Sequence, residues 1–280
     1  MEKAIKRYFP IFVLPTMIAF TLGFIIPFAE GVYLSFCKFT TVNDAKFIGL
    51  SNYAKVFKDS TFVHAFWYTA AFTVVSVILI NVLAFAVALL LTKGIKGTNV
   101  FRTVFFMPNL IGGIVLGYIW QLLLNGILMK FSRTLTYSST FGFWGLVILM
   151  CWQQIGYMMI IYFACIQNIP GELIEAAEID GATKRQVLKS VTIPMVMPSI
   201  TVCTFLTLTN SFKLFDQNLA LTNGEPSKMS EMLALNIFTT FYGRAGYEGV
   251  GQAKAVIFFI LVAAIALTQN YLTRRKEVQQ

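Results

Sequence analysis

Long runs of apolar residues, separated by shorter polar stretches, dominate this chain. The six runs fall at about 10–36, 65–92, 103–125, 141–166, 193–215 and 253–272. Each is long enough for a membrane-spanning helix. Backbone groups in lipid must be paired internally, and the alternating pattern of membrane strands is absent, so the runs indicate helices. The pattern therefore predicts an all-α integral membrane protein with six transmembrane helices.

One polar stretch, 167–192, differs from the other connections because its residues favour helix. Pro170 suits a helix opening, and Glu172 and Glu175 follow it where the helix dipole favours acids. Gly181 then interrupts the helical pattern, as a sharp bend between two short helices would require. The stretch predicts a stiff helix–turn–helix held at the membrane surface by both ends. An ordinary amphipathic connector is the alternative interpretation.

Composition agrees with a membrane protein. Hydrophobic residues make up 57% of the 280 positions and charged residues only 12%, whereas soluble domains are about 25% charged. The net charge of +9 does not indicate nucleic-acid binding, because the basic residues lie at the ends of the apolar runs. The apolar run after the basic amino terminus is too long for a signal peptide, so we expect a retained first span.

The sequence offers little for catalysis or metal binding. Cys37, Cys151, Cys165 and Cys203 have no metal-ligand spacing, and three of them lie inside apolar runs. His64 is the single histidine and lies at a span edge, where an interfacial role is expected. No paired carboxylates or Ser/His/Asp set occurs in the spans. We expect no catalytic residues, no metal and no enzyme activity in this chain alone.

Charge placement predicts the orientation. An even number of spans puts both termini on one side of the membrane, and clustered basic residues favour the cytoplasm. The compact clusters are Lys93, Lys96 and Arg102 in one loop, and Arg274, Arg275 and Lys276 at the carboxyl end. Both termini and the stretch 167–192 are therefore predicted to be cytoplasmic.

The residues of the polar stretch match a known pattern. Glu175-Ala-Ala177, then Gly181, then Val191-x-Ile-Pro194 resembles the cytoplasmic loop of bacterial ABC-importer permeases, with two conservative changes in the last block. The full spacing between two spans is specific, although Glu-Ala-Ala alone would carry no weight. The spacing is therefore the feature on which the resemblance mainly depends.

The resemblance covers nearly the whole chain. Phe12-Val-Leu-Pro15, the stretch Phe47–Tyr53 and Phe106-Met-Pro108 look like carbohydrate importer permeases, and Leu221–Pro226 fits apart from Glu225 in place of a glycine. The chain is most similar to the half of the maltose and glycerol-3-phosphate type that begins with the Leu-Pro run. The resemblance implies the type I ABC importer fold in a bacterial inner (cytoplasmic) membrane.

It also implies an arrangement of regions and partners. Residues 1–64 would form the first transmembrane helix and an outer loop, 65–272 the transmembrane core with the coupling loop 167–192, and 273–280 a basic cytoplasmic tail. The implied partners are a second permease subunit in a heterodimer, an ATPase dimer, an extracytoplasmic binding protein and membrane lipid. The residues implied to dock on the ATPase are Glu175, Ala176, Ala177, Asp180, Gly181 and Ala182.

The energy source would lie outside this chain. No Gly-x4-Gly-Lys-Ser/Thr motif occurs, and Lys93-Gly-Ile-Lys-Gly-Thr98 does not supply one. We therefore expect no cofactor on this chain, with ATP-Mg on the partner ATPase subunits. ATP-driven closure of these subunits would move the coupling loop and bias the spans between inward-facing and outward-facing states.

Neutral polar residues in the spans are candidates for the substrate path. Gln154 and Tyr157 are three apart and share a helix face. The resemblance to maltose-type permeases places the path at Gln154, Tyr157, Asn210, Ser211 and Leu214. Hydrogen bonding between helices, worth about 0.6 kcal/mol each, is the simpler interpretation of such residues.

The predicted function is uptake of a sugar or oligosaccharide, with several alternatives open. Few charges lie deep in the predicted spans, and Glu30 and Lys213 lie near the outer ends of the first and fifth. The lack of acids at mid-membrane argues against a secondary transporter. A secondary transporter or channel without an ATPase, a permease for glycerol-3-phosphate or another acidic substrate, and a non-transporting scaffold remain the alternatives.

Overall fold

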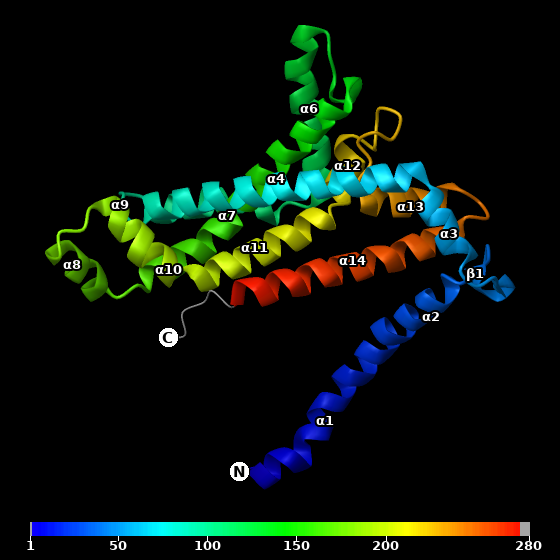
Figure 1. The fold of residues 1–280 in the computed structure, drawn as a ribbon, viewed down its shortest axis with the longest axis horizontal. Helices are drawn as coiled ribbons and strands as arrows, with labels where there is room; N and C mark the ends of the chain where they lie inside the picture. The colour runs from blue at the N-terminus through cyan, green and yellow to red at the C-terminus, as the bar shows by residue number, and fades with distance from the viewer. Residues whose placement is uncertain (1, 275–280) are drawn as a thin grey trace. The chain divides into compact units, whose positions relative to one another are not determined.

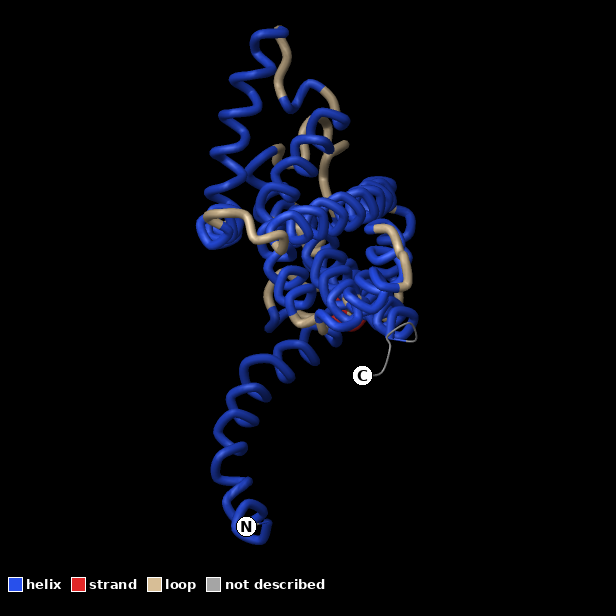
Figure 2. Tube along the Cα trace, turned by 90° about the vertical axis from the view of Figure 1, so that its left-hand side faces the viewer, coloured by secondary structure: helices blue, strands red, loops and turns tan. Residues whose placement is uncertain are grey.

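The computed structural model describes residues 2–274 (Figure 1). Positions 275–280 of the predicted basic tail 273–280 lie outside the described residues. Figure 2 shows that helices make up most of the trace. The helices are α1 (Glu2–Phe20), α2 (Ile26–Leu34), α3 (Ser51–Lys58), α4 (Ser60–Leu91), α5 (Thr98–Phe106), α6 (Gly113–Leu128), α7 (Ser139–Gln167), α8 (Gly171–Ile179), α9 (Lys184–Val187), α10 (Ile193–Met195), α11 (Met197–Phe212), α12 (Asp216–Leu221), α13 (Leu233–Gly243) and α14 (Glu248–Arg274).

The spans agree with the predicted number and differ at some edges. Within residues 2–274, five helices are long and apolar enough to cross a membrane, and a bent helix pair makes a sixth candidate. The predicted third span, 103–125, is divided. Its first part lies in α5, and a 3-10 turn at Met107–Leu110 separates α5 from α6. Pro108 lacks an N–H and the pair Gly112-Gly113 follows, so a continuous helix is not favoured there.

The fifth span is sharply bent. Lys184–Met195 and Met197–Phe212 meet at an angle of 68°. Pro194 and Pro198 each remove a helical N–H, and the π-helical segment Leu188–Thr192 precedes the bend. Only the second half, Met197–Phe212, is mostly apolar, whereas the first half carries Lys184, Arg185 and Lys189, so apolar length predicted α11 but not the bend before it.

The chain divides into two compact units. One contains residues up to Ser60 together with 237–260, and the other contains 61–236 and the chain from 261 onward. In the first unit, a short antiparallel hairpin pairs β1 (Cys37–Lys38) with β2 (Lys46–Phe47). This hairpin is the strand content found in the described residues, so the all-α prediction holds apart from these two short strands.

The second unit has a helix-packed core. Its buried residues come mainly from α4 and α7, such as Phe72, Leu146 and Met158, with Cys203 from α11. Gly156 allows the closest approach, because a Cβ there would lie 1.7 Å from the backbone oxygen of Phe105. Small residues at such contacts let membrane helices pack backbone to backbone.

Candidate functional site

The predicted helix–turn–helix is present between α7 and α11. α8 directly follows Pro170, and its first turn contains Glu172. α9 begins after Thr183, whose side chain forms a capping box with Gln186. Figure 1 shows α8 and α9 beyond the ends of the long helices α4 and α7. The sequence prediction of two short helices joined by a bend is therefore confirmed.

The bend explains the spacing of the Glu-Ala-Ala pattern. Gly181 has a φ of +78°, and its backbone N–H donates to the backbone carbonyl oxygen of Glu178 over 3.0 Å. The next N–H, of Ala182, donates to the Ala177 oxygen over 2.9 Å. These two bonds form a Schellman motif, which closes a helix with a left-handed residue, usually glycine. Gly181 is thus required four residues after Ala177 by backbone geometry.

The residues predicted to dock on the ATPase lie largely at the surface. Glu175, Ala176, Asp180 and Gly181 are exposed, while Ala177 and Ala182 are half-buried. The most exposed apolar side chain of the loop is Ile179 at 86%. Ile179 therefore projects from α8 with little contact to the rest of the described chain.

The predicted path residues are buried or half-buried in the second unit. Gln154, Ser211 and Leu214 are buried, and Tyr157 and Asn210 are half-buried. Leu214 packs in the core of the second unit. The structure records no hydrogen bond between any two of the five among the described residues. Gln154 and Tyr157 lie on α7, Asn210 and Ser211 lie near the end of α11, and Leu214 follows that helix, so their shared role in a path stays a prediction.

Two of these residues nevertheless hold unsatisfied polar atoms. Within residues 2–274, the Oε1 atom of Gln154 and the Oγ atom of Ser211 are buried without a hydrogen-bond partner. Buried polar atoms are normally paired, and an unpaired one costs about 1–3 kcal/mol. Such atoms provide hydrogen-bonding capacity that packing inside this chain does not use.

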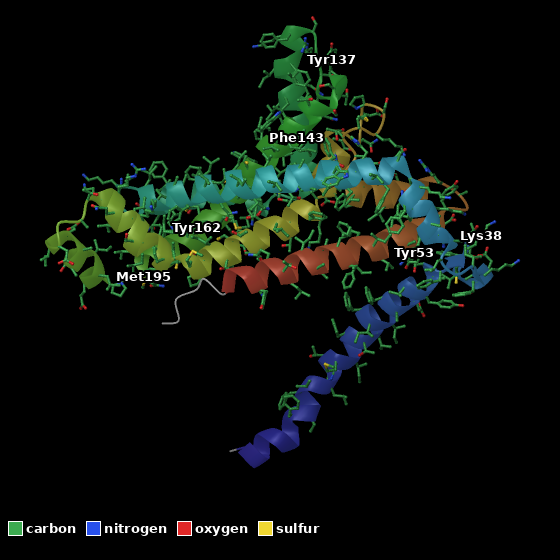
Figure 3. The ribbon with its side chains drawn as sticks, viewed as in Figure 1. Lys38, Tyr53, Tyr137, Phe143, Tyr162 and Met195 are labelled. Atoms are coloured by element: carbon green, nitrogen blue, oxygen red, sulfur yellow. The ribbon has the colours of Figure 1, made fainter. Side chains whose placement is uncertain are left out.

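Other polar side chains make the interhelical bonds instead. The hydroxyl of Tyr162, a residue labelled in Figure 3, donates to Asn81 Oδ1 over 2.7 Å. Asn81 Nδ2 donates to Thr207 Oγ1 over 3.3 Å. Gln217 Nε2 likewise donates to Gln153 Oε1 over 2.8 Å. Asn81, Gln153 and their partners therefore join helices, which is the simpler role that mid-span amides suggest.

A buried charge pair in the first unit was missed from the sequence. Lys254 is fully buried in α14, and its Nζ atom lies 2.8 Å from Asp59 Oδ2. The same Nζ donates to Thr240 Oγ1 over 2.8 Å. Lys254 is the second residue of the predicted sixth span, 253–272. Its partner is far away in sequence, so no local pattern could reveal the pair.

Metal binding has no support in the described residues, where no group of three or more His, Cys, Asp or Glu side chains gathers. The candidate spans and the exposed polar helix–turn–helix are those of a multi-pass membrane protein. The chain matches the family described as binding-protein-dependent transport system inner membrane component over residues 87–278. It belongs to that family.

Similarity to individual proteins supports this family membership. The chain is 43% identical to a probable starch degradation products transport system permease protein, AmyD, of Thermoanaerobacterium thermosulfurigenes, covering 96% of this chain and 94% of the relative. It is 28% identical to the trehalose/maltose transport system permease protein MalF of Thermococcus litoralis, covering 91% and 90%. The fold resembles a bacterial ABC transporter involved in import of the acidic polysaccharide alginate, with a TM-score of 0.82, 22% identity and 98% of each chain covered.

Proposed function

We propose that this chain is one permease subunit of an ATP-driven importer for a sugar or oligosaccharide delivered by an extracytoplasmic binding protein. Family membership over residues 87–278 is the observation that carries the proposal. The names of relatives that transport starch degradation products and trehalose or maltose support a carbohydrate substrate. A second permease subunit, different from this one, completes the path.

The energy comes from a separate ATPase dimer that holds ATP-Mg. The chain contains no phosphate-binding loop motif, so it does not hydrolyse ATP itself. The docking residues are Glu175, Ala176, Ala177, Asp180, Gly181 and Ala182. Their support is the exposed surface of α8 and the rigid Schellman bend that fixes it. Both termini and this loop lie on the cytoplasmic side.

The substrate path includes Gln154, Tyr157, Asn210, Ser211 and Leu214. The unpaired Oε1 of Gln154 and Oγ of Ser211 support this role, because sugar hydroxyls can donate to and accept from such groups. The path opens when the ATPases move the loop, since the five residues are buried or half-buried in this structure. ATP binding supplies the free energy that shifts this equilibrium.

The docking proposal is tested by two matched glycine variants. Gly181 and Gly246 have φ +78 and +81, and a Cβ at either position would meet nothing within 4 Å. Both Gly181→Leu and Gly246→Leu therefore introduce similar backbone strain. We expect Gly181→Leu to lower ATP-driven uptake at least about tenfold, the effect of losing about 1.4 kcal/mol of contact.

Gly246→Leu should retain uptake, and both variants should reach the membrane in normal amounts. Normal uptake with Gly181→Leu would sink the docking assignment. Liposomes that contain only this chain provide the second measurement. Substrate flux through them would favour a secondary transporter or channel, whereas the proposal predicts none without the ATPase and the second permease.

A further inference from the structure

A cavity of about 700 Å³ lies between the helix–turn–helix and the ends of two spans. Its apolar lining includes Leu89 from the end of α4 and Ile166 from the end of α7. Ile174 from α8 and Leu188 line it from the side of the loop. The volume falls in the range of roughly 300–1,000 Å³ that is typical of small-molecule sites. We call this space the loop cavity.

The charges of the loop cavity are predominantly positive. Lys93, Lys184 and Arg185 line it, and Glu178 is the acidic residue in its lining. All four side chains are exposed. Within residues 2–274 none of the three basic residues forms a salt bridge. An apolar interior with a basic edge complements a ligand that joins a negative group to a hydrocarbon portion.

We propose that the loop cavity binds one anionic phospholipid. Its phosphate lies near Lys93, Lys184 and Arg185. The part of an acyl chain next to the headgroup lies against Leu89 and Ile174. The cavity lies where the spans α4 and α7 end, which is the depth of lipid headgroups. Basic pockets between helices on the cytoplasmic side are suited to anionic headgroups. The leaflet assignment rests on the proposed function, which places this loop in the cytoplasm.

The lipid would connect the loop to the ends of the spans. The lining combines residues of α4 and α7 with residues of α8, α9 and the π-helical segment Leu188–Thr192. A molecule that contacts all of these holds α8 against the bundle. The lipid thereby positions the docking residues without contacting the substrate.

The test measures lipid binding to the purified importer complex by native mass spectrometry, in detergent and without ATP. Phosphatidylglycerol is titrated against phosphatidylcholine. We expect one phosphatidylglycerol per copy of this chain, retained in preference to phosphatidylcholine. The variant K93Q/K184Q/R185Q should bind it about a hundredfold more weakly, because each charge near an anionic headgroup contributes about fivefold. The control variant K96Q/K189Q changes two nearby exposed lysines outside the cavity and should bind normally.

A second variant keeps the charges and fills the apolar part. Ile174→Trp should also lose the lipid, and its retention would overturn the placement of the acyl chain. Unchanged binding by the triple variant, or equal loss by the control, would overturn the site. Displacement by inorganic phosphate alone would show an anion site and not a lipid site. Lipid binding needs no ATPase coupling, so this result is independent of the Gly181→Leu uptake measurement.

Discussion

The helix–turn–helix at 171–187 and the interior of α7 use polar residues in opposite ways. In the loop, Glu175 and Asp180 are exposed, and the bend is closed by backbone bonds of its own. In α7, Gln153 and Gln154 are both buried. The Nε2 and Oε1 atoms of Gln153 both form hydrogen bonds, whereas Oε1 of Gln154 forms none within residues 2–274. The polar residues of the loop are thus free to meet water or a partner, whereas the buried ones in α7 serve packing or a path.

The largest expected effect lies in a buried charge. Lys254→Met removes the 2.8 Å ion pair with Asp59 and the hydrogen bond to Thr240, and should lower the apparent free energy of unfolding by about 3–5 kcal/mol. Thermal unfolding of the purified protein in detergent measures this. Lys213→Met is the control, because Lys213 is exposed, and should change stability by less than about 0.5 kcal/mol. Equal effects would remove the distinction between buried and exposed polar groups.

A smaller loss is expected where helices touch. Gly156→Ala places a Cβ 1.7 Å from the Phe105 oxygen, so the backbones must separate. Overpacking of this kind costs about 1–3 kcal/mol. Gly126→Ala is the matched control on α6, because its Cβ would meet nothing within 4 Å. We expect the midpoint of thermal unfolding to fall for Gly156→Ala and to stay unchanged for Gly126→Ala. An unchanged midpoint for Gly156→Ala would contradict the close packing.

Two serines of α11 distinguish a role in the substrate path from a role in helix packing. The Ser199 hydroxyl donates to the Val196 oxygen over 2.8 Å, while Ser211 Oγ has no partner within residues 2–274. Ser199→Ala should therefore cost about 1 kcal/mol of stability, and Ser211→Ala should cost nothing. If Ser211 contacts substrate, its alanine variant lowers uptake about fivefold. Unchanged uptake would leave Ser211 outside the path.

The smallest effect concerns the hairpin of β1 and β2, a second exposed region with hydrogen bonds of its own. The backbone N–H groups of Thr40 and Thr41 donate to Asp44 and hold the pKa of that carboxyl below its usual range. A lowered folded pKa stabilises the hairpin above the unfolded value of about 3.9, and the effect is lost as pH falls through the folded pKa. Carbon-13 NMR of the Asp44 carboxyl measures this, and a midpoint at or above the unfolded value would contradict the turn.

Much of this architecture could be predicted from sequence, because a long apolar run specifies a spanning helix, and a glycine in a helical insert specifies a bend, through neighbouring residues alone. Pro108 and Pro194 were visible, yet the break after α5 and the bend of 68° depend on how neighbouring helices satisfy the freed backbone groups. The pairing of Lys254 with Asp59 joins distant positions and left no periodic signal. For the path, the sequence gives the polar residues but not which of them packing leaves unpaired.

Docking of the loop on a separate ATPase is most directly tested by site-specific photo-crosslinking in cells. A photoreactive residue at Ile179, which is 86% exposed, should form a covalent adduct with the ATPase subunit. The same residue at Tyr242, which is 73% exposed and predicted to lie on the outer side, should not. An assembled importer that gives no ATPase adduct from Ile179, or gives one equally from Tyr242, would contradict the account.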